Sequence, residues 1–195
     1  MGMSKWLVAA VAWSAAAGVQ AQAPAPAPPA ERAMAYITPY AGYAHLRIDA
    51  GRIYNEPDPA KMDAFQLGAA FGFRWPFGLL IEVAHSEAVH AEIFNSDDID
   101  LEQNSGAIGW RIPFADGWHL IPKVGREHWN LASNHRVLLD EDGVRHKALD
   151  DWENFWEVGL TREINRKISL GVNFRDVDEQ FGHSRSGTFT ASFAF

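Results

Sequence analysis

The chain has 195 residues, enough for one domain of ordinary size, and carries a formal net charge of -8. This charge argues against nucleic acid as a partner, since phosphate binding requires a basic surface. There is no cysteine, so a disulfide framework and thiolate metal ligands are excluded.

Residues 1–21 have the pattern of a secretory signal peptide. Lys5 supplies the positive start, residues 6–17 are apolar, and Val19-Gln20-Ala21 forms a small-x-small cleavage site. A membrane anchor is the alternative, but the apolar run of about twelve residues is shorter than the roughly 20 that a spanning helix needs. Residues 22–32 are predicted to be an Ala/Pro-rich linker, and residues 33–195 a single β-barrel domain.

From residue 36 onward, apolar and polar residues alternate. In residues 65–75, Phe65, Leu67, Phe71 and Phe73 share one face, with Gln66 and small residues opposite, as expected for a β-strand. The same alternation predicts eight strands, at residues 36–48, 65–75, 79–92, 101–112, 118–129, 152–164, 168–176 and 186–195.

The predicted connections alternate between long loops and short turns. The short turns lie at residues 76–78, 113–117 and 165–167, and the longest loop covers residues 130–151. An even number of antiparallel strands with long loops at one end and tight turns at the other indicates an all-β, eight-stranded, up-and-down transmembrane barrel. Both termini would then lie on the short-turn side, in the periplasm.

The apolar face carries bulky aromatic residues in several strands, while the opposite face is mainly glycine, alanine, serine and threonine. Because an eight-stranded barrel has a lumen that side chains fill, the small residues are expected inside and the aromatic residues toward lipid. A soluble, lipocalin-like barrel also has eight alternating strands and is the alternative, with the polarity reversed.

Charged residues occur singly on the predicted inner face, where isolated charges would be costly and should pair. They are Arg74, Glu82, Arg111, Lys123, Glu157, Glu163 and Arg175. Counting back from the turn at 165–167 places Glu157 opposite Arg175, which predicts an interior ion pair. A polar plug is favoured over a proton-conducting path, because an eight-stranded barrel leaves little room for a channel.

The predicted long loops are rich in carboxylates, which suit Ca²⁺ or Mg²⁺. The acidic groups are Asp97, Asp98 and Asp100; Asp140, Glu141 and Asp142; and Asp150, Asp151 and Glu153. Their spacing matches no EF-hand, and solvated surface charge is the favoured interpretation. No metal site and no cofactor motif is predicted: there is no H-E-x-x-H and no glycine-rich phosphate loop.

Arg126 and His128 fall on the lipid-facing parity near the outer rim, where they are predicted to contact lipopolysaccharide phosphates. This stretch has some similarity to the lipid A deacylase PagL, an eight-stranded barrel with a lipid-facing His-x-Ser pair and an acidic residue. His128 matches the histidine of that motif, but Asn130 stands at the serine position and Ser133 has the wrong parity. The resemblance makes a lipid A-modifying enzyme the alternative function, and no catalytic residue is assigned.

The last ten residues read S-G-T-F-T-A-S-F-A-F and alternate in the same way. They resemble the closing strand of bacterial outer-membrane barrels, and that resemblance implies an assembly signal in Phe189, Phe193 and Phe195. This strand is expected to close the barrel by pairing with residues 36–48.

In overall pattern, residues 33–195 resemble the small outer-membrane barrels of the OmpA transmembrane domain, OmpX and Ail type. The resemblance implies a non-enzymatic integral outer-membrane protein with a structural, adhesion or surface-interaction role carried by extracellular loops. The implied partners are outer-membrane lipid and lipopolysaccharide, the barrel-assembly machinery, and host or surface ligands at the loops.

Overall fold

The computed structural model describes residues 33–54, 58–90, 99–133, 137–140, 142–179 and 182–195. The predicted signal peptide at 1–21 and the linker at 22–32 lie outside these residues. The chain divides into two units, 1–31 and 32–195, and the fold below is that of the second. Over the described ranges, no helix is long and apolar enough to cross a membrane.

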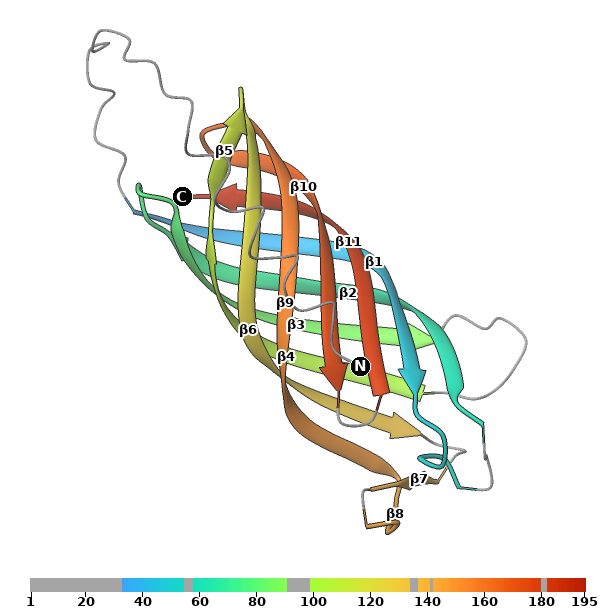
Figure 1. The fold of residues 1–195 in the computed structure, drawn as a ribbon. Coiled ribbons are helices and arrows are strands. Elements are labelled where there is room, and N and C mark those ends of the chain that lie inside the picture. Colours follow the sequence, from blue (N-terminus) through green and yellow to red (C-terminus); the bar gives the residue numbers. More distant parts are fainter. Residues whose placement is uncertain (1–32, 55–57, 91–98, 134–136, 141, 180–181) are drawn as a thin grey trace, which may run out of the picture. The chain divides into compact units, whose positions relative to one another are not determined.

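Eleven strands are formed in the described residues: β1 (Met34–Ile48), β2 (Ala60–Arg74), β3 (Leu79–His90), β4 (Ile99–Trp110), β5 (Ile112–Ala115), β6 (Trp118–Ser133), β7 (Leu138–Leu139), β8 (Arg145–His146), β9 (Ala148–Asn165), β10 (Ile168–Glu179) and β11 (Gly182–Ala194). The sheet has the order β4-β3-β2-β1-β11-β10-β9-β6-β5, all antiparallel, and β4 also pairs with β6. This last pairing closes the sheet into a barrel (Figure 1). Short β5 continues β4 alongside β6, so the barrel has eight strands, as predicted.

The closing strand pairs with the first strand as the sequence indicates. Tyr36 is the Cα partner of Ala194, and Ile48 is the partner of Gly182 at the other end of the same ladder. The start of β1 and the end of β11 therefore lie at one end of the barrel, together with the short turns. Figure 1 shows the small hairpin of β7 and β8 beyond the opposite end.

Several predicted boundaries are wrong, because the strands continue into segments that were expected to be loops. Residues 130–151 are not one loop: β6 runs to Ser133, β9 begins at Ala148, and β7 pairs with β8 between them. Likewise, residues 182–185 belong to β11 rather than to a loop. Alternation marks where a strand faces an apolar surface, whereas backbone hydrogen bonding extends the ladder into the polar region beyond it.

The turn predicted at 113–117 is also shorter than expected. Residues 112–115 form β5, and the chain reverses at residues 116–117, where Gly117 has a φ of 70° that favours glycine. The third strand is described as far as His90, and its predicted last residues, 91 and 92, lie outside the described part of the chain.

The outer surface carries the bulky apolar side chains. Val83 is 61% exposed and Phe189 74%, and large apolar residues on other barrel strands are similarly open, including Phe71, Ile108, Val124, Trp156, Val172 and Phe193. Threonine, serine, glutamine and charged residues are buried inside instead. The barrel thus has the reverse of a water-soluble protein's polarity.

The first strand is an exception to the rule that aromatic residues point outward. Tyr36 is buried, and Tyr40 lies inside with it. Each ring covers a glycine of β2: a Cβ added to Gly72 would lie 2.5 Å from Cζ of Tyr36, and one added to Gly68 would lie 2.5 Å from Cζ of Tyr40. Glycine at these positions makes room for two aromatic rings in a narrow lumen.

An apolar cluster fills the long-loop end of the barrel interior. Its buried members are Leu46, Ile48, Ile53, Ala64, Ala88, Leu101, Trp129, Leu131 and Leu138. Ile53 and Leu138 come from two different connections, which form a β-bridge with each other and are joined by hydrogen bonds from Tyr54 N to Val137 O (2.9 Å) and from Leu139 N to Arg52 O (2.8 Å). Two surface connections therefore close this end with buried apolar side chains.

Candidate functional site

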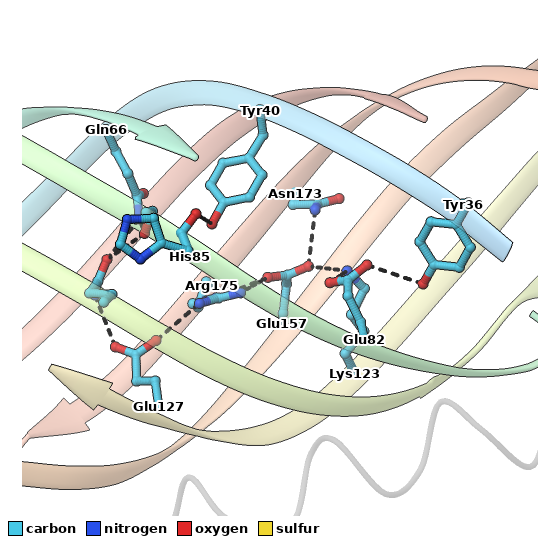
Figure 2. Close-up of polar contacts among 12 residues, drawn as sticks. Tyr36, Tyr40, Gln66, Glu82, His85, Lys123, Glu127, Glu157, Asn173 and Arg175 are labelled. Carbon is cyan, nitrogen blue, oxygen red and sulfur yellow. Dashed lines mark hydrogen bonds and ion pairs between the residues drawn. The ribbon is translucent and has the colours of Figure 1, made fainter. Parts of the chain in front are cut away.

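The centre of the barrel interior holds an ion-pair network around Glu157 of β9. Lys123 Nζ lies 2.8 Å from Glu157 Oε1 and 2.8 Å from Glu82 Oε1, so one ammonium joins two carboxylates from strands that are not neighbours. Tyr36 Oη donates to Glu82 Oε2 at 3.1 Å, and Asn173 Nδ2 donates to Glu157 Oε1 at 2.9 Å. Figure 2 shows these side chains meeting across the lumen.

Arg175 of β10 extends the network toward the long-loop end. Its Nε and Nη2 lie 2.9 and 2.8 Å from Glu157 Oε2, and its Nη1 lies 3.0 Å from Glu127 Oε2. The guanidinium also lies 4.2 Å from the centre of the Phe155 ring. One arginine therefore bridges two buried carboxylates, and the planar fork of its donors suits that role.

Neutral side chains complete the network beyond Glu127. Gln103 Nε2 donates to Glu127 Oε1 at 2.9 Å, and Gln66 Nε2 donates to Gln103 Oε1 at 2.8 Å and to Ser86 Oγ at 2.9 Å. The carboxylate of Glu127 is fully buried, yet each of its oxygens accepts a hydrogen bond. Because both oxygens are hydrogen-bonded, the negative charge of Glu127 can be buried in the narrow lumen.

A second cluster lies at the short-turn end. Arg111 Nη2 lies 2.8 Å from Glu163 Oε2 and 3.2 Å from His119 Nδ1, and Arg74 Nη2 lies 3.8 Å from Met34 Sδ. Among the described residues, the two clusters together place four cationic side chains and four carboxylates in the interior: Arg74, Arg111, Lys123 and Arg175, with Glu82, Glu127, Glu157 and Glu163.

All seven charged residues predicted for the lumen line the interior, where the structure also brings Glu157 and Arg175 together. Glu127, Gln66 and Gln103 were not singled out from the sequence. Glu127 could have been found, because it has the same strand parity as Lys123 and lies between the outward-facing Arg126 and His128. The two glutamines alternate with outward residues in the same way, but an amide gives a weaker signal than a charge.

The described residues leave little free space along the polar network in the interior. Two cavities, of about 60 and 20 Å³, lie along the polar network, the larger at the short-turn end. Such volumes hold a few water molecules at most. The apolar cluster fills the other end, so the interior has the form of a polar plug capped by apolar packing.

Arg126 and His128 lie on the outer face of β6, as their parity predicts. Arg126 Nη2 donates to Trp152 O at 3.2 Å, and its guanidinium lies 5.7 Å from the centre of the Trp152 ring. The His128 ring contacts the same ring in a tilted arrangement, with centroids 5.2 Å apart and planes at 51°, and its Nε2 lies 3.3 Å from Asp150 Oδ2. Within the described ranges no serine hydroxyl is hydrogen-bonded to His128, so its partner is an acid but not a nucleophile.

A belt of four histidine–carboxylate contacts surrounds the outer face toward the long-loop end. Each contact joins two paired strands that are connected at the end of the barrel opposite the short turns, and the closest atoms lie 2.7 to 3.9 Å apart. The contacts are His45 with Asp63, His85 with Glu102, His128 with Asp150, and His183 with Asp176. We call these eight residues the outer polar belt. It bounds the apolar surface where the strands approach the loops.

Neither a family model nor a curated protein matches the sequence. Solved structures do match. Neisserial surface protein A, NspA, is 12% identical with a TM-score of 0.64, covering 85% of this chain and 100% of that one. Ail of Yersinia pestis is 12% identical with a TM-score of 0.51, covering 82% and 98%. The N-terminal barrel domain of Pseudomonas aeruginosa OprF is 12% identical with a TM-score of 0.51, covering 83% and 97%.

These similarities define the class of fold: the chain forms a small eight-stranded barrel of the kind found in outer-membrane proteins. At such low identity they show the fold alone. The resemblance in fold that the sequence indicates is thereby confirmed.

Proposed function

We propose that this chain is a non-enzymatic integral protein of the bacterial outer membrane. The barrel spans the bilayer, and the extracellular loops carry a structural, adhesion or surface-interaction role. The observation that carries this proposal is the reversed polarity of the barrel, with bulky apolar side chains outside and a paired ionic network inside. Water would leave the outer surface without a favourable partner, whereas lipid supplies one.

The barrel is oriented with its short turns in the periplasm and its long loops at the cell surface. In this orientation both termini are periplasmic. The start of β1 and the end of β11 lie at the short-turn end, which supports the assignment. Residues 1–21 act as the signal peptide that exports the chain.

The interior supports a structural rather than a conducting role. Each charge of the central network has a partner of opposite charge, and the free volume is small. The network stabilises the closed barrel from within, while the connected loops that carry Ile53 and Leu138 present a surface for host or other external ligands.

Lipid and lipopolysaccharide are the partners of the outer surface. Arg126 and His128 contact their phosphate groups at the rim, and the outward Phe189, Phe193 and Phe195 are recognised by the barrel-assembly machinery. The deacylase alternative lacks support, because a serine-type acyl transfer needs a nucleophile beside the histidine and His128 contacts Asp150 and Trp152 instead.

Membrane fractionation and gel mobility test the proposal. The protein should be found in the outer-membrane fraction, and the unboiled form should migrate differently from the boiled form because a closed barrel resists unfolding by detergent. Recovery as a soluble periplasmic protein would refute the membrane assignment. Mass spectrometry of lipid A from cells with and without the protein should show the same acyl chains, and loss of a chain would establish the enzymatic alternative.

A further inference from the structure

The outer face of the barrel is hollowed by a groove that crosses its strands. The groove has a volume of about 630 Å³ and includes Ile37 of β1, Phe71 of β2, Val83 of β3, Gly106 of β4 and Arg126 of β6, and it reaches Trp152 of β9. Its volume is within the roughly 300–1,000 Å³ typical of ligand pockets. Five steps between neighbouring strands, about 4.8 Å each, give it a length of roughly 20–25 Å.

Small outward-facing residues create the groove. On β2, Ala69 stands between the outward Leu67 and Phe71, and on β4, Gly106 stands between the outward Asn104 and Ile108. A Cβ added to Gly106 would meet no atom within 4 Å, so no close approach of the backbone requires glycine there. The absence of a side chain at Gly106 leaves this part of the outer surface open and so forms the groove.

The two ends of the groove differ in chemistry. Ile37, Phe71 and Val83 make one part apolar, whereas the part near the outer polar belt contains His85, Asn104 and Arg126. His85 Nδ1 and Asn104 Oδ1 lie 2.9 Å apart, and Asn104 Nδ2 donates to Glu102 Oε1 at 3.3 Å, so these polar groups are engaged with one another.

Arg126 differs from the other polar residues of the groove. Its guanidinium contacts the carbonyl oxygen and the ring of Trp152, and in the described part of the chain it forms no ion pair with a carboxylate. A positive charge at the lipid surface without an acidic partner favours an anionic group from a ligand, and arginine suits the oxygens of a phosphate.

We propose that this groove binds one acyl chain of a phosphate-bearing lipid of the outer leaflet, with the phosphate at Arg126. The chain lies along Val83, Phe71 and Ile37, and the headgroup lies at the level of Trp152. This inference rests on the proposed membrane location and adds a defined lipid site to it. One leaflet has a hydrocarbon thickness of roughly 15 Å, which is less than the length of the groove. An acyl chain that lies obliquely to the membrane normal can therefore follow the groove and stay within the leaflet.

Native mass spectrometry of the purified full chain in detergent micelles tests the site. The probe is dimyristoyl phosphatidylglycerol, and the comparison lipid is dimyristoyl phosphatidylcholine, which has the same chains but a zwitterionic headgroup. Gly106→Leu fills the groove. The matched control is Gly187→Leu on β11, because Gly187 also faces outward and a Cβ there also meets nothing within 4 Å.

The native protein should retain one phosphatidylglycerol saturably and in preference to phosphatidylcholine. Gly106→Leu should abolish this binding, and Gly187→Leu should leave it unchanged. Arg126→Gln should weaken phosphatidylglycerol binding about tenfold or more and remove the preference over phosphatidylcholine, because the charge-assisted hydrogen bonds are lost.

Equal binding by the Gly106→Leu and Gly187→Leu proteins would overturn the proposal, as would an unchanged headgroup preference in Arg126→Gln. Heat-dependent gel mobility of each variant shows whether its barrel has folded. A protein found in the outer membrane that binds no lipid saturably would refute the lipid site alone, whereas a soluble protein would refute the membrane assignment itself.

Discussion

Arg175 and Glu157 are Cα partners on β10 and β9, and two nitrogens of the guanidinium lie 2.8 and 2.9 Å from the same carboxylate oxygen. The other oxygen of Glu157 accepts from Lys123 and Asn173. Glu157 therefore joins both buried cations of the central network, and its removal affects more than one ion pair.

Replacing Glu157 by glutamine should destabilise the barrel strongly. The change leaves Lys123 and Arg175 short of one negative charge in a buried site, and breaking a buried pair by removing one partner typically costs about 3–5 kcal/mol. Urea unfolding of the protein in phospholipid vesicles, followed by tryptophan fluorescence, measures the loss. Asp63→Asn is the control, because its pair with His45 is exposed and should contribute about 1 kcal/mol or less. Equal unfolding midpoints for the two variants would contradict the structural role of the network.

Enlarging Gly72 should destabilise the barrel from within. A Cβ at this position would lie 2.5 Å from the Tyr36 ring and 2.5 Å from Ile81 O, so alanine forces the ring or the strand to shift. Overpacking of this kind costs roughly 1–3 kcal/mol. The same unfolding assay should show a clear loss for Gly72→Ala and almost none for Gly187→Ala, where the added methyl group points into open space. A Gly72→Ala protein as stable as the native one would show that the lumen can accommodate the extra volume.

The barrel should not conduct ions. The cavities along the polar network have volumes of about 60 and 20 Å³, and the long-loop end is filled by the apolar cluster around Leu138. Recordings in planar bilayers should show no steady openings above the noise. Reproducible unitary currents from the purified protein would be inconsistent with a plug.

The carboxyl group of Asp140 should titrate below the usual aspartate range. The backbone N–H of Val144 donates to Asp140 Oδ1 at 2.8 Å, and His146 Nε2 lies 2.9 Å from Oδ2; both interactions favour the charged carboxylate and lower the pKa of Asp140. Because the pKa is lower in the folded hairpin, the stabilisation is present above the ordinary aspartate pKa and is lost as pH falls through the folded value.

NMR titration of selectively labelled aspartate in the micelle-bound protein measures this pKa directly. The protection of the Val144 amide against hydrogen exchange, relative to the intrinsic rate at the same pH, should be high at neutral pH and fall in acid, and Asp140→Ala should remove it at both. Asp142→Ala is a suitable control, because Asp142 contributes its backbone N–H to Asp140 rather than its carboxylate. An Asp140 carboxyl group with the ordinary pKa would contradict the hydrogen-bonded hairpin.

The local sequence was sufficient to predict the strands, the direction in which their faces point and part of the strand register. The tight turn near residue 166 fixes which residues of β9 and β10 are opposite, and so the juxtaposition of Glu157 and Arg175 could be predicted from the spacing. The ends of the strands beyond the outer apolar surface could not be predicted in this way. In β6 after Trp129 and in β11 before Ser186, the strand continues through backbone pairing without an outward apolar face to mark it.

Contacts across the lumen could not be predicted from the local sequence. Lys123 meets Glu82 although β4 lies between their strands, and Gln66 reaches Gln103 across β3. Such contacts depend on the curvature of the closed sheet, which no local pattern encodes. The outer groove also required the structure, because it combines Ala69 on β2 with Gly106 on β4, two strands that are separated by β3.

By itself, the sequence determined that this protein is an eight-stranded barrel with apolar residues outside and charges inside, because strand periodicity and turn spacing are local properties of the chain. Only the tertiary structure decided which inward charges share a partner, which connections close the long-loop end, and where the outer surface is hollow. Closure of β1 on β11 and of β4 on β6 fixes the register of every strand at once, and that register places residues far apart in sequence beside one another.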